Sequence, residues 1–125
     1  MNIKELVENA YENAKRHGFW EDWFRIKQLE KIAMEVNKEM PDLLTEHKED
    51  VNNALGNRLM LITGEVAEAH EALRRKDYEN FKEELADIVI RTCDLAGGLD
   101  IDLEAEILKK MEKNKDRAYK HGKAF

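Results

Sequence analysis

Residues 64–72 read Gly-Glu-Val-Ala-Glu-Ala-His-Glu-Ala, and residues 83–87 read Glu-Glu-Leu-Ala-Asp. Each stretch contains two acidic residues three positions apart, Glu65 with Glu68 and Glu84 with Asp87. Because residues at this spacing share one face of a helix, each pair can direct two carboxylates at one point. Two such pairs on neighbouring antiparallel helices predict four carboxylates around a common centre. A buried cluster of this kind is costly unless a hard divalent cation such as Mg²⁺ neutralises it.

The 125-residue chain is acidic, with a formal net charge of -6 and 38% charged residues. Such a protein does not hold a nucleic-acid backbone by bulk electrostatics, so we expect no nucleic-acid polymer as partner. No apolar run has membrane-spanning length, and the first residues are too charged for a secretory signal. The single cysteine, Cys93, excludes an intramolecular disulfide and a multi-cysteine zinc site. We expect one domain, residues 1–125, in the cytoplasm, and no membrane partner.

The pattern of apolar residues predicts an all-α fold. The chain has one proline, and no stretch shows the sustained alternation that is typical of strands. Helical spacing predicts helices over residues 2–17, 21–40, about 46–75 and about 78–96, with a fifth that begins after Asp102. Gly18 and Pro41 are expected to end the first two helices, and Asp77 to cap the fourth. The result is a bundle of about five helices with a central antiparallel hairpin.

The acid pairs fall at distinct positions around their helices at about 100° per residue. Glu65 and Glu68 lie beside a predicted core stripe in the third helix. In the fourth helix, a polar strip runs between an apolar face and a face of mostly small residues that suits close approach of another helix, including one from a second subunit. Because a helix that is apolar on two sides is usually covered on both, we expect the polar strip to face an interior cleft. The core stripe is Leu59, Ile62, Val66, Ala69 and Leu73; the polar strip is Glu84, Asp87, Arg91 and Asp94; the small face is Ala86, Ile90, Cys93 and Gly97.

Three other interpretations compete with a magnesium site. In an acidic helical chain, acids three apart also arise by chance on a solvated face. A di-iron bundle needs Glu-x-x-His on two helices, and no acidic residue stands three positions before any of the four histidines. A non-catalytic helical interaction protein, with the small-residue face as its partner surface, remains the alternative to an enzyme.

Several motifs together resemble the MazG-like, all-α nucleoside triphosphate pyrophosphohydrolases. The family pattern is Glu-x-x-Glu on one helix and Glu-x-x-Asp on the next, and residues 64–74 (GEVAEAHEALR) and 83–97 (EELADIVIRTCDLAG) look like its central hairpin. Lys110 and Asn114 match a Lys-x-x-x-Asn spacing, and residues 13–20 (NAKRHGFW) are similar to the start of small stand-alone and phage-borne members. The resemblance covers most of residues 8–24 and 57–123. One departure is Gly64, since many members have an additional glutamate at that position.

The resemblance implies hydrolysis of a nucleoside triphosphate to the monophosphate and pyrophosphate, a reaction of nucleotide-pool housekeeping. It implies Mg²⁺, with Mn²⁺ as a substitute, on Glu65, Glu68, Glu84 and Asp87, and a base toward the attacking water that is Glu68 first and Glu65 second. Separately, the faces of the fourth helix predict assembly through that helix as at least a dimer, either a homodimer or a homotetramer. Base and sugar preference are not readable from spacing. The implied substrate-binding residues are Lys110, Asn114 and Arg117 for the phosphates, Lys120, His121 and Lys123 in a closing tail, and Trp20 for stacking on the base, against the plainer interpretation of surface charges, a helix end and corner packing.

Overall fold

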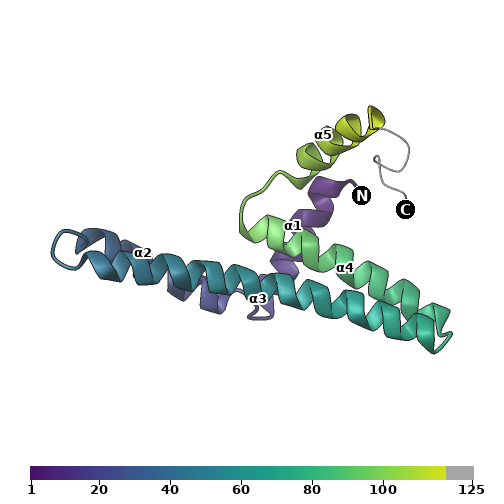
Figure 1. Cartoon of the computed structure of the whole chain (residues 1–125), viewed down its shortest axis with the longest axis horizontal. Coiled ribbons are helices and arrows are strands. Elements are labelled where there is room, and N and C mark those ends of the chain that lie inside the picture. The colour runs from purple at the N-terminus through teal and green to yellow at the C-terminus, as the bar shows by residue number, and fades with distance from the viewer. Residues whose placement is uncertain (118–125) are drawn as a thin grey trace.

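The computed structural model describes residues 1–117, and these fold into helices joined by short connections (Figure 1). No residue among them is in a β-strand, so the predicted all-α class is confirmed. None of these helices is long and apolar enough to cross a bilayer. The helices are α1 (Ile3–Arg16), α2 (Glu21–Glu35), α3 (Pro41–Arg74), α4 (Tyr78–Gly98) and α5 (Leu103–Lys115).

The long α3 and the shorter α4 form the central antiparallel hairpin (Figure 1). The first half of α3 runs alongside α2, while its second half packs against α4. α1 crosses the C-terminal part of α4, and α5 leaves the end of α4 and makes its main contact with α1. The hairpin therefore carries both acid pairs, and α1 and the corner before α2 lie beside it.

Most predicted helix boundaries hold because the expected caps form. The Asp77 side chain accepts a hydrogen bond from the Asn80 N–H at 3.1 Å, and Asp102 accepts one from the Ala105 N–H at 3.0 Å. These bonds satisfy backbone donors that the first helical turn leaves free. Gly18 takes a φ of 84°, which favours glycine, directly after α1.

The boundary between the second and third helices differs from the prediction. α2 ends at Glu35 and α3 begins at Pro41, whereas the sequence favoured one helix to residue 40 and another from about residue 46. Proline lacks an N–H donor and the first helical turn needs none, so the first helical position accommodates it. Pro41 therefore starts a helix and does not end one.

At Cys93 and Gly97, the small-residue face of α4 is covered by α1 of the same chain. A Cβ built on Gly97 would lie 2.6 Å from Tyr11 Cβ, and Cys93 is buried in a cluster with Val7 and Ala10 of α1. The expected close approach of another helix is therefore confirmed at Cys93 and Gly97, and that helix is α1 of the same chain and not one from a second subunit. The absence of a side chain at Gly97 allows α1 to approach α4 closely at this crossing.

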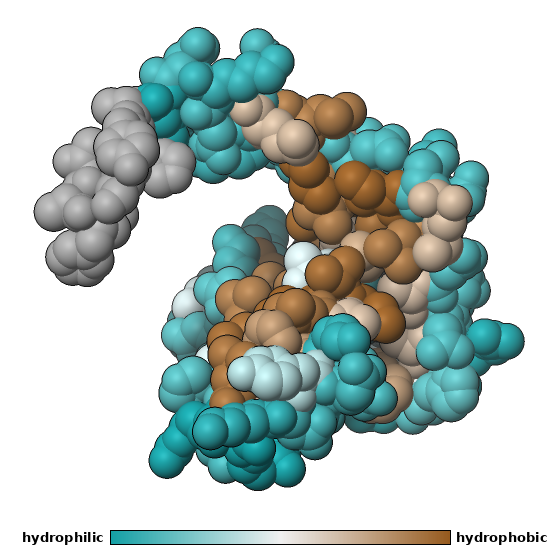
Figure 2. Space-filling view, turned by 90° about the vertical axis from the view of Figure 1, so that its right-hand side faces the viewer, coloured by the Kyte–Doolittle hydropathy of each residue, from teal (hydrophilic) through white to brown (hydrophobic). Residues whose placement is uncertain are grey.

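The predicted core stripe of α3 is largely exposed within one chain. Ala69 is buried at 5% exposure, but Leu59, Val66 and Leu73 are between 41% and 56% exposed. On α4, Leu85 and Val89 are likewise 46% and 50% exposed. Apolar side chains gather in a broad band on the face that Figure 2 shows. We call Leu59, Val66, Leu73, Leu85 and Val89 the open apolar face.

Candidate metal centre and adjoining pocket

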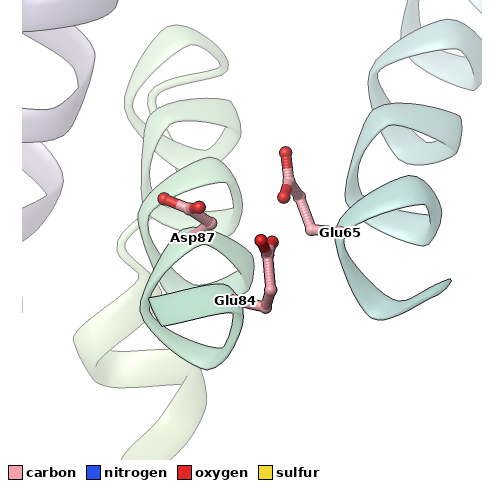
Figure 3. Close-up of side chains that lie close together, drawn as sticks. All are labelled: Glu65, Glu84 and Asp87. Carbon is pink, nitrogen blue, oxygen red and sulfur yellow. The ribbon is translucent and has the colours of Figure 1, made fainter. Parts of the chain in front are cut away.

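Three of the four predicted carboxylates converge where α3 faces α4. Glu65, Glu84 and Asp87 each offer an oxygen, and these oxygens all lie within 4.8 Å of one another. Glu65 extends from α3 toward Glu84, and Asp87 lies one turn further along α4 (Figure 3). The i,i+3 spacing on α4 and the antiparallel pairing of the hairpin produce this cluster. Carboxylate oxygens at such separations fit the needs of Mg²⁺ or Mn²⁺.

Glu84 is the most enclosed member of the cluster. Its residue is 8% exposed, and its Oε2 atom is buried without a hydrogen-bond partner among residues 1–117. The pKa of Glu84 is raised to about 7, first by a hydrogen bond shared with Glu65, then by burial and by the negative charge of Glu68. A buried acceptor with no donor is the kind of atom that a bound cation satisfies, so the donor set fits a hard metal ion.

Arg91 compensates the charge of Glu65. Its Nε atom donates a hydrogen bond to Glu65 Oε1 at 2.8 Å. The Glu65 side chain is 13% exposed, and the guanidinium beside it lowers the pKa of that carboxyl below its ordinary value. Glu65 is therefore a charged carboxylate next to Glu84, whose raised pKa favours the protonated form.

Glu68 and Asp87 are the exposed members of the two pairs. Glu68 is not within the group of three converging carboxylates, although its negative charge contributes to the raised pKa of Glu84. The structure thus brings together three of the four residues expected to hold the metal. It leaves Glu68 beside them and open to solvent.

A pocket of about 500 Å³ opens directly beside the cluster, bounded by α1, the corner before α2, α3 and α4. Glu65 and Asp87 form part of its wall, as do the apolar side chains of Leu61 and Ile90. The pocket also contains the strip residues Arg91 and Asp94, so most of the polar strip of α4 faces a cleft as predicted. Its remaining lining residues are Ala10, Asn13, Ala14, Gly18, Phe19, Asp22, Asn57 and Arg58.

The corner before α2 is held against the hairpin by Trp20 and Arg58. The Trp20 indole N–H donates to Asp94 Oδ1 at 2.6 Å, and the ring is 1% exposed. The Arg58 guanidinium lies 4.3 Å over that ring. Its bond to Asp22, with 2.8 Å between Nη2 and Oδ1, holds the pKa of Asp22 below its usual range. Because the Trp20 ring is enclosed, it has no free face for a base, and we assign it to packing instead of stacking.

The expected phosphate-binding residues do not lie at the acid cluster of their own chain. Lys110 and Asn114 belong to α5, Arg117 follows it, and all three are exposed. α5 packs against α1, away from the part of the hairpin that carries the acids (Figure 1). Lys120, His121 and Lys123 lie outside the described residues.

The sequence model of the MazG-like family matches residues 60–124. The chain belongs to the MazG-like family. The matched segment contains the C-terminal part of α3 from residue 60 and all of α4, and so both acid pairs, together with all of α5. No curated protein and no solved structure was found to match the chain.

Several contacts of this MazG-like chain could not be read from its acid motifs. The bond between Arg91 and Glu65 follows from the shared strip on α4, but its partner on α3 depends on the register of the hairpin. The bonds from Arg58 to Asp22 and from Trp20 to Asp94 join residues far apart in sequence. The available signal in the sequence was Arg58, which lies two helical turns before Glu65. It is a weak signal.

Proposed function

We propose that this chain hydrolyses a nucleoside triphosphate to the nucleoside monophosphate and pyrophosphate in a reaction that depends on Mg²⁺. One observation carries the proposal: three carboxylates converge beside a pocket of about 500 Å³, and two of them, Glu65 and Asp87, form part of its wall. A cavity of that size suits a small-molecule ligand, and a cluster of carboxylates suits the metal that accompanies a phosphate chain. Membership of the MazG-like family supports the same reaction. A nucleotide substrate fits a cytoplasmic enzyme of the nucleotide pool.

Glu65, Glu84 and Asp87 would hold the ion, Mg²⁺ or in its place Mn²⁺. A divalent metal supplies charge neutralisation of the phosphates and a bound water of lowered pKa. Glu68 is exposed beside the three ligands, so its carboxylate is available to accept a proton from the attacking water. Glu65 is second choice as base because its Oε1 already accepts the bond from Arg91.

The nucleoside would occupy the pocket next to the metal. Phe19, 63% exposed, replaces Trp20 as the aromatic side chain that can contact a base. Asn13 and Asn57 supply amide groups in the same wall, which can donate and accept hydrogen bonds. Discrimination between bases would therefore depend on these two amides and on the apolar surface of Leu61 and Ile90.

A second copy of the chain would complete the bundle as a homodimer or homotetramer. The open apolar face leaves five large side chains at least two fifths exposed, which is costly for an isolated chain in water. A second copy would also let the basic residues of α5 and the segment after it approach a neighbouring acid cluster. This gives Lys110, Asn114 and Arg117, with Lys120, His121 and Lys123, a proposed role in phosphate binding between subunits.

The test is a screen of ribo- and deoxyribonucleoside triphosphates, standard and modified, with Mg²⁺, with Mn²⁺ and with chelator. We expect at least one triphosphate to yield monophosphate and pyrophosphate in equal amounts, and chelator to stop the reaction. Production of the diphosphate and inorganic phosphate would contradict attack at the α-phosphorus. Absence of hydrolysis throughout the panel would favour the non-catalytic interaction protein.

A further inference from the structure

Two cationic side chains line the pocket among the residues that the structure describes, Arg58 and Arg91. Arg58 is already engaged. Its Nη1 donates to Asp22 Oδ2 and to the Ala54 carbonyl, both at 3.2 Å, and its Nη2 donates to Asp22 Oδ1 at 2.8 Å and to the Phe19 carbonyl at 3.3 Å. With its plane also over the Trp20 ring, Arg58 anchors the corner and has little capacity left for a ligand.

Arg91 is engaged at one nitrogen only. Its Nε donates to Glu65 Oε1, while Nη1 and Nη2 donate to no residue in the range 1–117. The side chain is 36% exposed and forms part of the pocket wall. A guanidinium has five N–H donors in a fixed planar fork, so four of them remain available to a molecule in the pocket.

The charges around the pocket favour a role for this cation in binding an anionic ligand. Asp22, Glu65, Asp87 and Asp94 line the pocket, opposed by the two arginines. Asp22 is neutralised by Arg58. In the absence of both Arg91 and a metal ion, the wall formed by the remaining three carboxylates would repel a phosphate chain, and Arg91 adds a positive charge to the one that the metal would supply. The cations of α5 do not offset this charge within one chain, because α5 packs against α1.

We propose that Arg91 binds the phosphate chain of the substrate, with its Nε held by the metal ligand Glu65 and its terminal amino groups donating to non-bridging phosphate oxygens. This inference rests on the proposed function and adds a residue outside the two acid pairs. The bond to Glu65 fixes the plane of the guanidinium, and a fixed fork matches phosphate bidentately.

The test compares Arg91→Gln and Arg91→Lys with wild type by calorimetric titration of pyrophosphate in the presence of Mg²⁺. Loss of charge-assisted hydrogen bonds predicts about 10- to 100-fold weaker binding for Arg91→Gln. Arg91→Lys is expected to fall between the two, because lysine keeps the charge without the planar fork. Arg74→Gln is the matched control, since Arg74 pairs with Glu71 on an exposed turn of α3 and should bind as wild type does.

A second measurement separates phosphate binding from a purely structural role. Mn²⁺ affinity without nucleotide, followed by electron paramagnetic resonance, is expected to be kept or raised in Arg91→Gln, because a competing cation leaves Glu65. A parallel loss of Mn²⁺ and pyrophosphate affinity would show that Arg91 acts only through Glu65 and would overturn the proposal. Pyrophosphate binding by Arg91→Gln that equals binding by Arg74→Gln would also overturn the proposal.

Kinetics distinguish this inference from the proposed function. For the triphosphate that wild type hydrolyses, Arg91→Gln is expected to raise KM about tenfold or more. Unchanged KM in that variant would overturn the inference and leave the proposed function standing. Failure of the wild-type chain to release pyrophosphate from any triphosphate would overturn both.

Discussion

The Glu84 carboxyl group is 8% exposed, lies close to Glu65 and Asp87, and keeps one oxygen without a partner among the described residues. The pKa values of two neighbouring carboxyl groups shift in opposite directions. Arg91 lowers the pKa of Glu65, whereas the pKa of Glu84 is raised to about 7. Glu65 is thus charged, whereas Glu84 favours its protonated form. Residues that differ in this way are typical of functional sites.

The first prediction concerns the metal-free chain between pH 4.5 and 7. Because the pKa of Glu84 rises from 4.5 to about 7 on folding, the folded chain binds more protons there than the unfolded chain. The contribution of Glu84 to stability is therefore full below pH 4.5, falls as the pH rises to about 7 and is constant above. Urea unfolding at pH 5, 6, 7 and 8 in the presence of chelator measures this contribution to stability.

Replacement of Glu84 by Gln removes this titration, so Glu84→Gln should show a smaller loss of stability over the same range. Glu83→Gln is the matched control, because Glu83 is an exposed neighbour on the same helix. Equal pH dependence in wild type and Glu84→Gln would contradict the assignment of the raised pKa to this residue. The shift at Glu65 has the opposite sign and acts below pH 4.5.

At the scale of the element, two glycines of α4 lie where this helix packs against α1 and against the corner before α2. A Cβ on Gly98 would overlap the Trp20 ring, and a Cβ on Gly97 would crowd Tyr11. The sequence predicted that this helix ends at about residue 96, and α4 ends two residues later, at Gly98. These glycines also leave room for the Tyr11 and Trp20 side chains. That role depends on tertiary contacts, which helical spacing alone does not predict.

Gly98→Ala is therefore expected to destabilise the chain by about 1–3 kcal/mol through overpacking against Trp20. Gly56→Ala is the control within a helix, because a Cβ there meets nothing within 4 Å. That substitution should stabilise by up to about 1 kcal/mol through helix propensity. Urea unfolding checks both, and equal effects of the two substitutions would contradict the packing described at Gly98.

The open apolar face belongs to the same scale and supports a second subunit. Val66→Glu and Leu85→Glu place a charge on that face and should lower the mass measured by light scattering, since burying an unpaired charge is unfavourable. Ala67→Glu, at an exposed position outside the face, should leave the mass unchanged. A wild-type chain that is monomeric at working concentration and fully active would contradict assembly through this face.

At the scale of the whole molecule, the sequence predicted the helices, their order and three of the converging carboxylates, because each follows from local periodicity or i,i+3 spacing. The sequence predicted that Leu59, Val66 and Leu73 are core residues, but in a single chain their side chains are exposed. It also assigned Trp20 to stacking, although the ring is enclosed by long-range contacts. Spacing along one helix fixes which residues share a face, whereas the element that covers the face is a property of the assembled molecule.

The most direct test of the central claim is pyrophosphate release with Mg²⁺ by Asp87→Asn, compared with wild type and with Asp50→Asn. Asp87 is exposed, so its replacement should leave the helical circular dichroism unchanged while removing one ligand from the cluster. Asp50 is an exposed aspartate elsewhere on α3 and serves as control. We predict loss of nearly all turnover in Asp87→Asn and wild-type turnover in Asp50→Asn. Turnover in Asp87→Asn equal to that of wild type would contradict a catalytic metal held by Glu65, Glu84 and Asp87.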